Sequence, residues 1–133
     1  MIMKHTGYGY SKTVPYTFED ALTKTTAALS EKGFGVLTEI DVKETMKKKL
    51  DKDLLPYKIL GACNPEFAFK ALQTEEQTGL MLPCNVIVYI NADKETVVSA
   101  VDPLASMIAI NNPALAEIAG TVQNMLKEVI ESI

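Results

Sequence analysis

The residues best suited to chemistry are two Cys-Asn pairs, Cys63-Asn64 and Cys84-Asn85, which hold the two cysteines of the chain. Each pair borders an apolar run with the composition of a β-strand. A thiolate is both a nucleophile and a soft metal ligand, and an amide side chain can donate and accept hydrogen bonds. We therefore expect the two segments to approach each other in the fold and to form a binding site from these four residues.

Four interpretations of the thiols are open at this stage. The commonest role of a free cysteine is simple packing in the core. Alternatively, Cys63 and Cys84 could hold a soft metal ion such as zinc or copper, with a third donor from His5, Met81 or a second copy of the chain. A redox thiol pair is a third interpretation, because Cys63 lies next to a predicted helix start that would favour its thiolate. A catalytic nucleophile is the fourth, although the sequence indicates no histidine base near either thiol.

Other polar residues have simpler explanations. Helix starts at Asn64-Pro65 and Asp102-Pro103 could bind an anion, but plain helix capping by the Asn and Asp side chains is the usual role of such pairs. His5 lies near the terminus and is expected to be solvated. The tyrosines at strand positions are expected to pack across strands, and they are Tyr8, Tyr10, Tyr57 and Tyr89.

Hydrophobic spacing predicts the elements that must position these residues. Helices are expected at 18–32, after a capping box from Thr17 to Asp20, and at 113–133, where an unbroken apolar stripe is clearest. Shorter helices are expected before Leu50, with Met46 and Leu50 facing inward, and after Pro65. Strands are expected at 7–14, 34–41, 57–63, 85–91 and 96–101. In the strand 34–41, strict alternation would place Phe34, Val36, Thr38 and Ile40 on one face.

This order of elements indicates the α+β class. The prediction is a single domain over 1–133, with a mainly antiparallel five-stranded sheet and helices on one face. A long terminal helix needs a broad apolar surface, and a sheet of this size supplies one.

Composition restricts the function classes. The 133 residues contain thirteen lysines and no arginine, with a net charge of −4. The absence of guanidinium groups and the negative charge argue against nucleic-acid binding. No apolar run is long enough for a membrane span, and the first residues do not have the pattern of a secretory signal. Two cysteines do not make a disulfide framework, so we expect reduced thiols and a cytoplasmic location.

Four segments together resemble a known family. They are GFGVLTEIDV (33–42), PYKILGACNP (56–65), LPCNVIVY (82–89) and VSAVDP (98–103). In this order they are similar to the family called domain of unknown function 302. The resemblance implies a β-α-β(4)-α sheet of TATA-binding-protein-like architecture, a tendency to form homodimers, and two Cys-Asn segments that belong to the family pattern. It implies no reaction and no catalytic residues.

The sequence therefore predicts a small protein that binds a small ligand or soft metal near Cys63, Asn64, Cys84 and Asn85, without turnover. Two alternatives stay open. One is a thiol-based redox or sulfur-transfer enzyme, and the other is a structural or regulatory dimer without a ligand.

Overall fold

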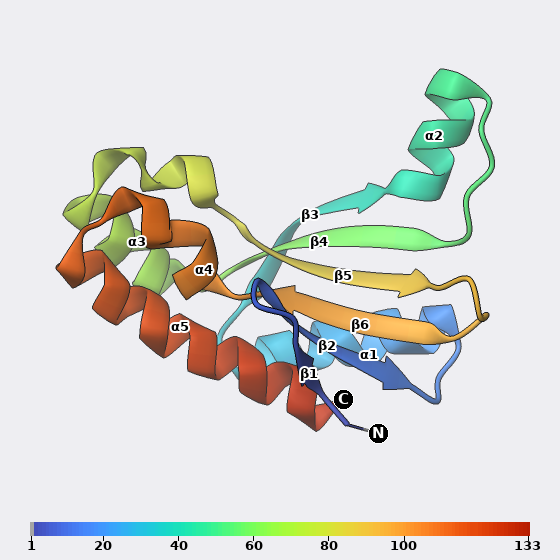
Figure 1. Cartoon of the computed structure of the whole chain (residues 1–133), viewed down its shortest axis with the longest axis horizontal. Coiled ribbons are helices and arrows are strands. Elements are labelled where there is room, and N and C mark those ends of the chain that lie inside the picture. The colour runs from blue at the N-terminus through green and yellow to red at the C-terminus, as the bar shows by residue number, and fades with distance from the viewer. Residues whose placement is uncertain (1) are drawn as a thin grey trace.

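The computed structural model describes residues 2–133, and Figure 1 shows the arrangement of its elements. The strands are β1 (Lys4–His5), β2 (Gly9–Val14), β3 (Gly35–Asp41), β4 (Tyr57–Cys63), β5 (Cys84–Ile90) and β6 (Thr96–Val101). The α-helices are α1 (Phe18–Glu31), α2 (Val42–Leu50), α3 (Pro65–Thr74), α4 (Pro103–Met107) and α5 (Pro113–Ser132). Two short 3₁₀ helices, η1 (Glu76–Met81) and η2 (Ile108–Ile110), complete the described chain.

All strand pairs are antiparallel, in the order β1-β2-β6-β5-β4-β3. The predicted α+β class and antiparallel sheet are therefore confirmed, but the predicted number of five strands is wrong, because the sheet has six. The extra strand, β1, pairs Lys4 with Ser11 and His5 with Tyr10. A strand of two residues is too short to show any alternation of polar and apolar side chains, so no sequence pattern marks it.

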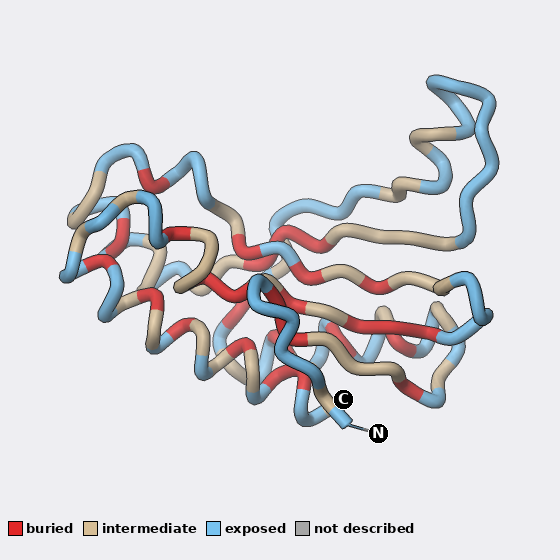
Figure 2. The backbone as a smooth tube through the Cα atoms, in the orientation of Figure 1, coloured by how far each residue is buried: buried red, intermediate tan, exposed pale blue. Residues whose placement is uncertain are grey.

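One face of the sheet carries the core. Alternate side chains of β4, β5 and β6 are fully buried there, among them Leu60, Val86 and Val98. They pack against the apolar sides of α1 and α5, including Leu29 and Leu126. Figure 2 shows the buried positions recurring along these strands and helices. We call this side the covered face of the sheet and the opposite side the open face.

Local side-chain hydrogen bonds begin two of the predicted helices. Thr17 Oγ1 accepts a hydrogen bond from the backbone N–H of Asp20 at 3.1 Å, which starts α1 as expected. Asn112 caps α5 by accepting from the N–H groups of Ala114 and Leu115. The long apolar stripe of α5 then lies against the covered face, so the clearest pattern in the sequence marks the main helix of the core.

Two predictions for the β3–α2 region are wrong. A bulge at Leu37 interrupts the alternation of β3, so Val36 pairs with Ala62 but Thr38 pairs with Gly61. Val36 therefore lies on the covered face, whereas Thr38 and Ile40 lie on the open face. Leu50, expected to face inward, is 63% exposed, because α2 extends beyond the sheet and buries none of its residues.

Among residues 2–133, no helix is both long enough and apolar enough to cross a membrane.

Candidate functional site

The two cysteines lie at adjacent register positions of neighbouring strands. Cys84 begins β5 and pairs with Ala62 of β4, and Cys63 is the next residue of β4. Antiparallel pairing brings the end of one predicted segment beside the start of the other, although a helix and a connector separate them in sequence. The expected approach of the two thiol-bearing segments is thus present in the fold.

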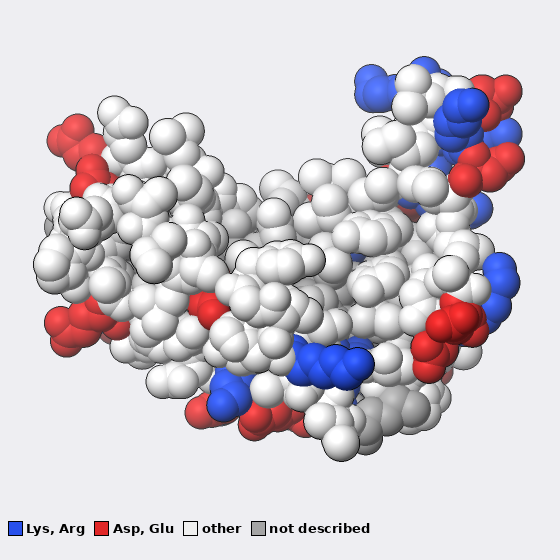
Figure 3. All heavy atoms as spheres, viewed as in Figure 1, with Lys and Arg blue, Asp and Glu red and all other residues white. Residues whose placement is uncertain are grey.

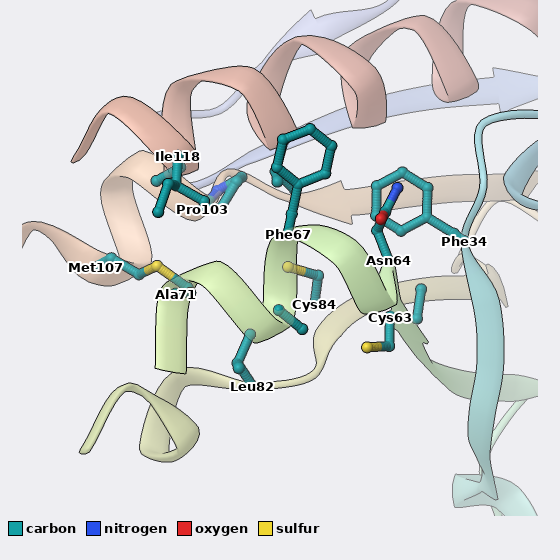
Figure 4. A pocket seen from close by; sticks show the side chains of 14 residues that line it. Phe34, Cys63, Asn64, Phe67, Ala71, Leu82, Cys84, Pro103, Met107 and Ile118 are labelled. Carbon is teal, nitrogen blue, oxygen red and sulfur yellow. The ribbon is translucent and has the colours of Figure 1, made fainter. Parts of the chain in front are cut away.

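A small cavity lies where these strands meet α3, α4 and α5 (Figure 4). Its volume is about 30 Å³. Three of the four predicted residues line it, namely Cys63, Asn64 and Cys84. The other lining side chains are almost all apolar and include Phe34, Phe67, Leu82, Met107, Ile118 and Val122. Space of this size accepts one or two water-sized groups, whereas pockets for organic ligands are about 300–1,000 Å³.

The two thiols differ in environment. Cys84 is only 7% exposed and belongs to the main core, whereas Cys63 is half-buried. Burial, and to a smaller extent the neighbouring Cys63, raise the pKa of the Cys84 thiol to about 11. The thiolate is the form that attacks electrophiles, so Cys84 is a neutral thiol at physiological pH and a poor nucleophile in the free protein.

The two asparagines also differ. Asn64 precedes α3, but its side chain makes no capping hydrogen bond to that helix, so the expected capping role is wrong. Instead, Asn64 Nδ2 donates to the backbone carbonyl of Lys32 at 3.3 Å, which ties the start of α3 to the end of α1. Asn85 is exposed and pairs with Gly61, and it does not line the cavity.

Close packing at Gly61 holds the two Cys-Asn segments together. A Cβ atom at this position would lie 2.8 Å from Cγ of Pro83 and would also collide with Oγ1 of Thr38. Pro83 directly precedes Cys84, and Gly61 lies two residues before Cys63. The absence of a side chain at Gly61 is therefore what lets the second segment lie directly on the first.

Comparison with known proteins agrees with this geometry. The family described as Domain of unknown function DUF302 matches residues 10–133, which include every residue of the cavity. This chain belongs to the DUF302 family. A crystal structure of an uncharacterized conserved DUF302 protein from Bacillus stearothermophilus is 28% identical and covers 92% of this chain and 95% of that chain, with a TM-score of 0.87. No curated protein matches the sequence.

One sulfur-containing residue that lines the cavity, Met107, was not predicted from the sequence. Met107, at the end of α4, is a buried lining residue, so three sulfur-containing residues line the cavity. The register places the Cys84 side chain on the covered face and the Cys63 side chain on the opposite one, and Figure 4 shows their sulfur atoms apart. The third donors considered from the sequence lie elsewhere, because neither His5 nor Met81 lines the cavity. The only signal for Met107 was its place in a helix that starts at Asp102-Pro103, directly after the strand predicted at 96–101. Within residues 2–133, no cluster of three or more His, Cys, Asp or Glu side chains has a metal-binding arrangement.

A second polar cluster surrounds Asp102, which is 3% exposed. Its carboxylate accepts from His5 Nε2 at 2.9 Å and from Gln123 Nε2 at 3.0 Å, and it caps α4 through the N–H groups of Leu104 and Ala105. Burial alone would raise the pKa of Asp102, but these hydrogen bonds outweigh it and hold the pKa below its ordinary value. His5 stacks on Tyr10, with ring centroids 4.6 Å apart.

His5 is exposed, as expected, with 48% of its side chain open to solvent, and it also contacts Asp102 and pairs with Tyr10. Tyr57 and Tyr89 stack across β4 and β5 at 5.2 Å between ring centroids, as expected for cross-strand packing.

Proposed function

We propose that this chain is a binding protein that holds a soft metal ion, or another small polarizable ligand, beside Cys63 and Cys84 without catalytic turnover. One observation supports the proposal most directly: Cys63, Cys84 and Met107 line the same small cavity. Thiolate and thioether sulfur atoms are the ligands that favour Cu(I) over harder ions.

The volume of the cavity favours an ion over an organic molecule. A space of about 30 Å³ has room for one ion, but it is far too small for a metabolite unless α3 or α4 moves. Structural zinc sites require four ligands, of which the described residues supply two thiols. A univalent soft ion suits two thiols better than zinc does, because a single thiolate neutralises the charge of such an ion in apolar surroundings.

The raised pKa of Cys84 gives the proposed binding a definite pH dependence. The thiol is protonated below about pH 11, so an ion that binds the thiolate must displace a proton. Apparent affinity should therefore rise with pH across the neutral range. The same protonation disfavours the redox or sulfur-transfer alternative at Cys84, and no observation favours that alternative over binding.

The test is an anaerobic titration of the reduced protein with Ag(I), a redox-stable analogue of Cu(I), in competition with a chromophoric chelator. We expect one ion per chain, and at least about tenfold weaker binding in Cys63→Ala and Cys84→Ala. Met81→Leu is the matched control, because it removes a thioether outside the cavity. Thermal melts of each variant confirm folding. Absence of stoichiometric binding, or binding that Cys84→Ala leaves unchanged, would refute the proposal.

Three further properties rest on the resemblance and on general chemistry, and we propose them with the function. The sheet is of TATA-binding-protein-like architecture, without any implied DNA binding. The chain is a homodimer. Its location is cytoplasmic, where two free thiols stay reduced.

A further inference from the structure

The segment between β3 and β4 has no core of its own. We define the arm as residues 42–55, which comprise α2 and the loop after it. No residue of α2 is buried, and Leu50, Leu54 and Leu55 are all exposed. An isolated helix of nine residues is marginal in water, because helices this short depend on tertiary packing. Figure 1 shows the arm extending away from the sheet, and Figure 2 shows it without a buried position.

The open face of strands β2 to β6 is uncharged, and the short edge strand β1 adds one lysine, Lys4. Its strand positions follow from the register, because side chains of paired residues lie on the same face. They are Lys4, Gly9, Ser11, Thr13, Gly35, Thr38, Ile40, Tyr57, Ile59, Gly61, Cys63, Asn85, Ile87, Tyr89, Val97, Ser99 and Val101. Figure 3 looks onto this face, with α1 behind the strands, and shows a largely white central area between charged ends, with lysine atoms at its lower edge. Strand faces open to water usually carry charged or polar residues, whereas this one combines tyrosine, isoleucine and valine.

The two ends of the open face carry opposite charge. The arm lies at the Tyr57 end of β4 and has five lysines against three carboxylates. The opposite end, beyond Cys63, carries what we call the end lobe, residues 64–82 and 102–120. Apart from Asp102, which is buried, the end lobe has four carboxylates and one lysine.

Within residues 2–133, several of these charges form no ion pair. Lys48, Lys49 and Lys52 of the arm make none, and neither do Glu75, Glu76 and Glu117 of the end lobe. Unpaired charges of opposite sign therefore stand at the two ends of a face whose positions on β2 to β6 are uncharged.

We infer that a second copy of this chain covers the open face, related by a two-fold axis that runs across the strands, so that each arm contacts the end lobe of its partner. An axis along the strands would instead bring arm to arm and lysines to lysines, which like-charge repulsion disfavours. The arrangement places the tyrosines and isoleucines at the centre and the charges at the rim, as in protein interfaces generally. It also covers the exposed leucines of the arm. The inference rests on the proposed homodimer and adds its surface and orientation.

Charge reversal tests the orientation. Lys48→Glu with Lys49→Glu should weaken the dimer at least about tenfold in sedimentation equilibrium at low salt, because like charges would then meet at the rim. Glu75→Lys with Glu76→Lys should weaken it similarly, and the combination of all four substitutions should restore it. Lys24→Glu with Lys127→Glu is the matched control, because it makes the same charge change on α1 and α5 and should leave the dimer intact.

A substitution on the open face itself distinguishes failure of the homodimer from failure of the proposed surface or orientation. Ile40 is 47% exposed on the open face, so Ile40→Glu should fold normally and still abolish the dimer. A wild-type monomer at every concentration would refute both the homodimer and this inference. A dimer that neither Ile40→Glu nor the arm variant weakens would refute the inference alone. A dimer that these variants weaken, but the fourfold variant does not restore, would refute the proposed orientation. None of these outcomes depends on Ag(I) binding at the cavity.

Discussion

The same strands form both faces of the sheet, but only the covered face packs against helices of the chain. On the covered face, side chains such as Leu60 and Val98 are in contact with α1 and α5 and lose all contact with water. On the open face, their neighbours Ile59 and Ser99 are only half-buried. The difference shows that hydrophobicity alone does not decide which face is buried here, because both faces carry apolar side chains and only one packs against helices of the chain.

The largest expected effect compares neighbouring residues of β4. Leu60 is 1% exposed on the covered face, so Leu60→Ala should reduce the free energy of unfolding by about 2–5 kcal/mol. Ile59→Ala, on the open face, should cost about 1 kcal/mol in the monomer, because that side chain is only partly buried. Urea denaturation of both variants at low concentration measures the contrast. Equal losses would show that the open face is as well packed as the core.

The second prediction concerns the buried carboxylate that joins β6 to α5. Asp102→Asn should destabilise the fold by about 3 kcal/mol, because it leaves donors from His5, Gln123 and the α4 backbone in competition for one amide oxygen. His5→Ala removes a single donor at the surface and should cost less.

Asp102 also predicts a pH dependence. Its pKa in the folded protein is lower than in the unfolded chain, so its contribution to stability is present above about pH 4 and is lost as the pH falls through the folded value. Acid denaturation of wild type and Asp102→Asn, followed by circular dichroism, measures this contribution. The difference between the two proteins should shrink at low pH. A constant difference would mean that charge at Asp102 is not what stabilises the fold.

The smallest of these effects on stability is expected at Gly61, where the open face is tightly packed. Gly61→Ala should reduce the free energy of unfolding by about 1–3 kcal/mol, because the added methyl group meets Thr38 and the rigid ring of Pro83. Gly35→Ala is the control in the adjacent strand, since a Cβ atom there has no neighbour within 4 Å. Thermal denaturation distinguishes the two. A Gly61→Ala variant as stable as Gly35→Ala would show that the two Cys-Asn segments are not held together by close packing at this point.

Much of the fold was predictable because it depends on local patterns. The stripe of α5, the capping threonine of α1 and the apolar runs of β4, β5 and β6 each mark their element within a short window of sequence. Predictions failed where tertiary contacts override the local pattern. The bulge at Leu37 changes the face of every later β3 residue, and β1 pairs with β2 while its His5 contacts Asp102, ninety-seven residues away in sequence.

The candidate site divides in the same way. The residue types of Cys63 and Cys84, and their places at strand ends, followed from the sequence alone. Only the register of β4 and β5, together with the packing of α3, α4 and α5 against their ends, decided that both cysteines and Met107 line one cavity and that Asn85 lies outside it. The physical reason is that composition and periodicity act over a few residues, whereas a cavity forms where distant segments fail to fill space completely, and that depends on how they pack.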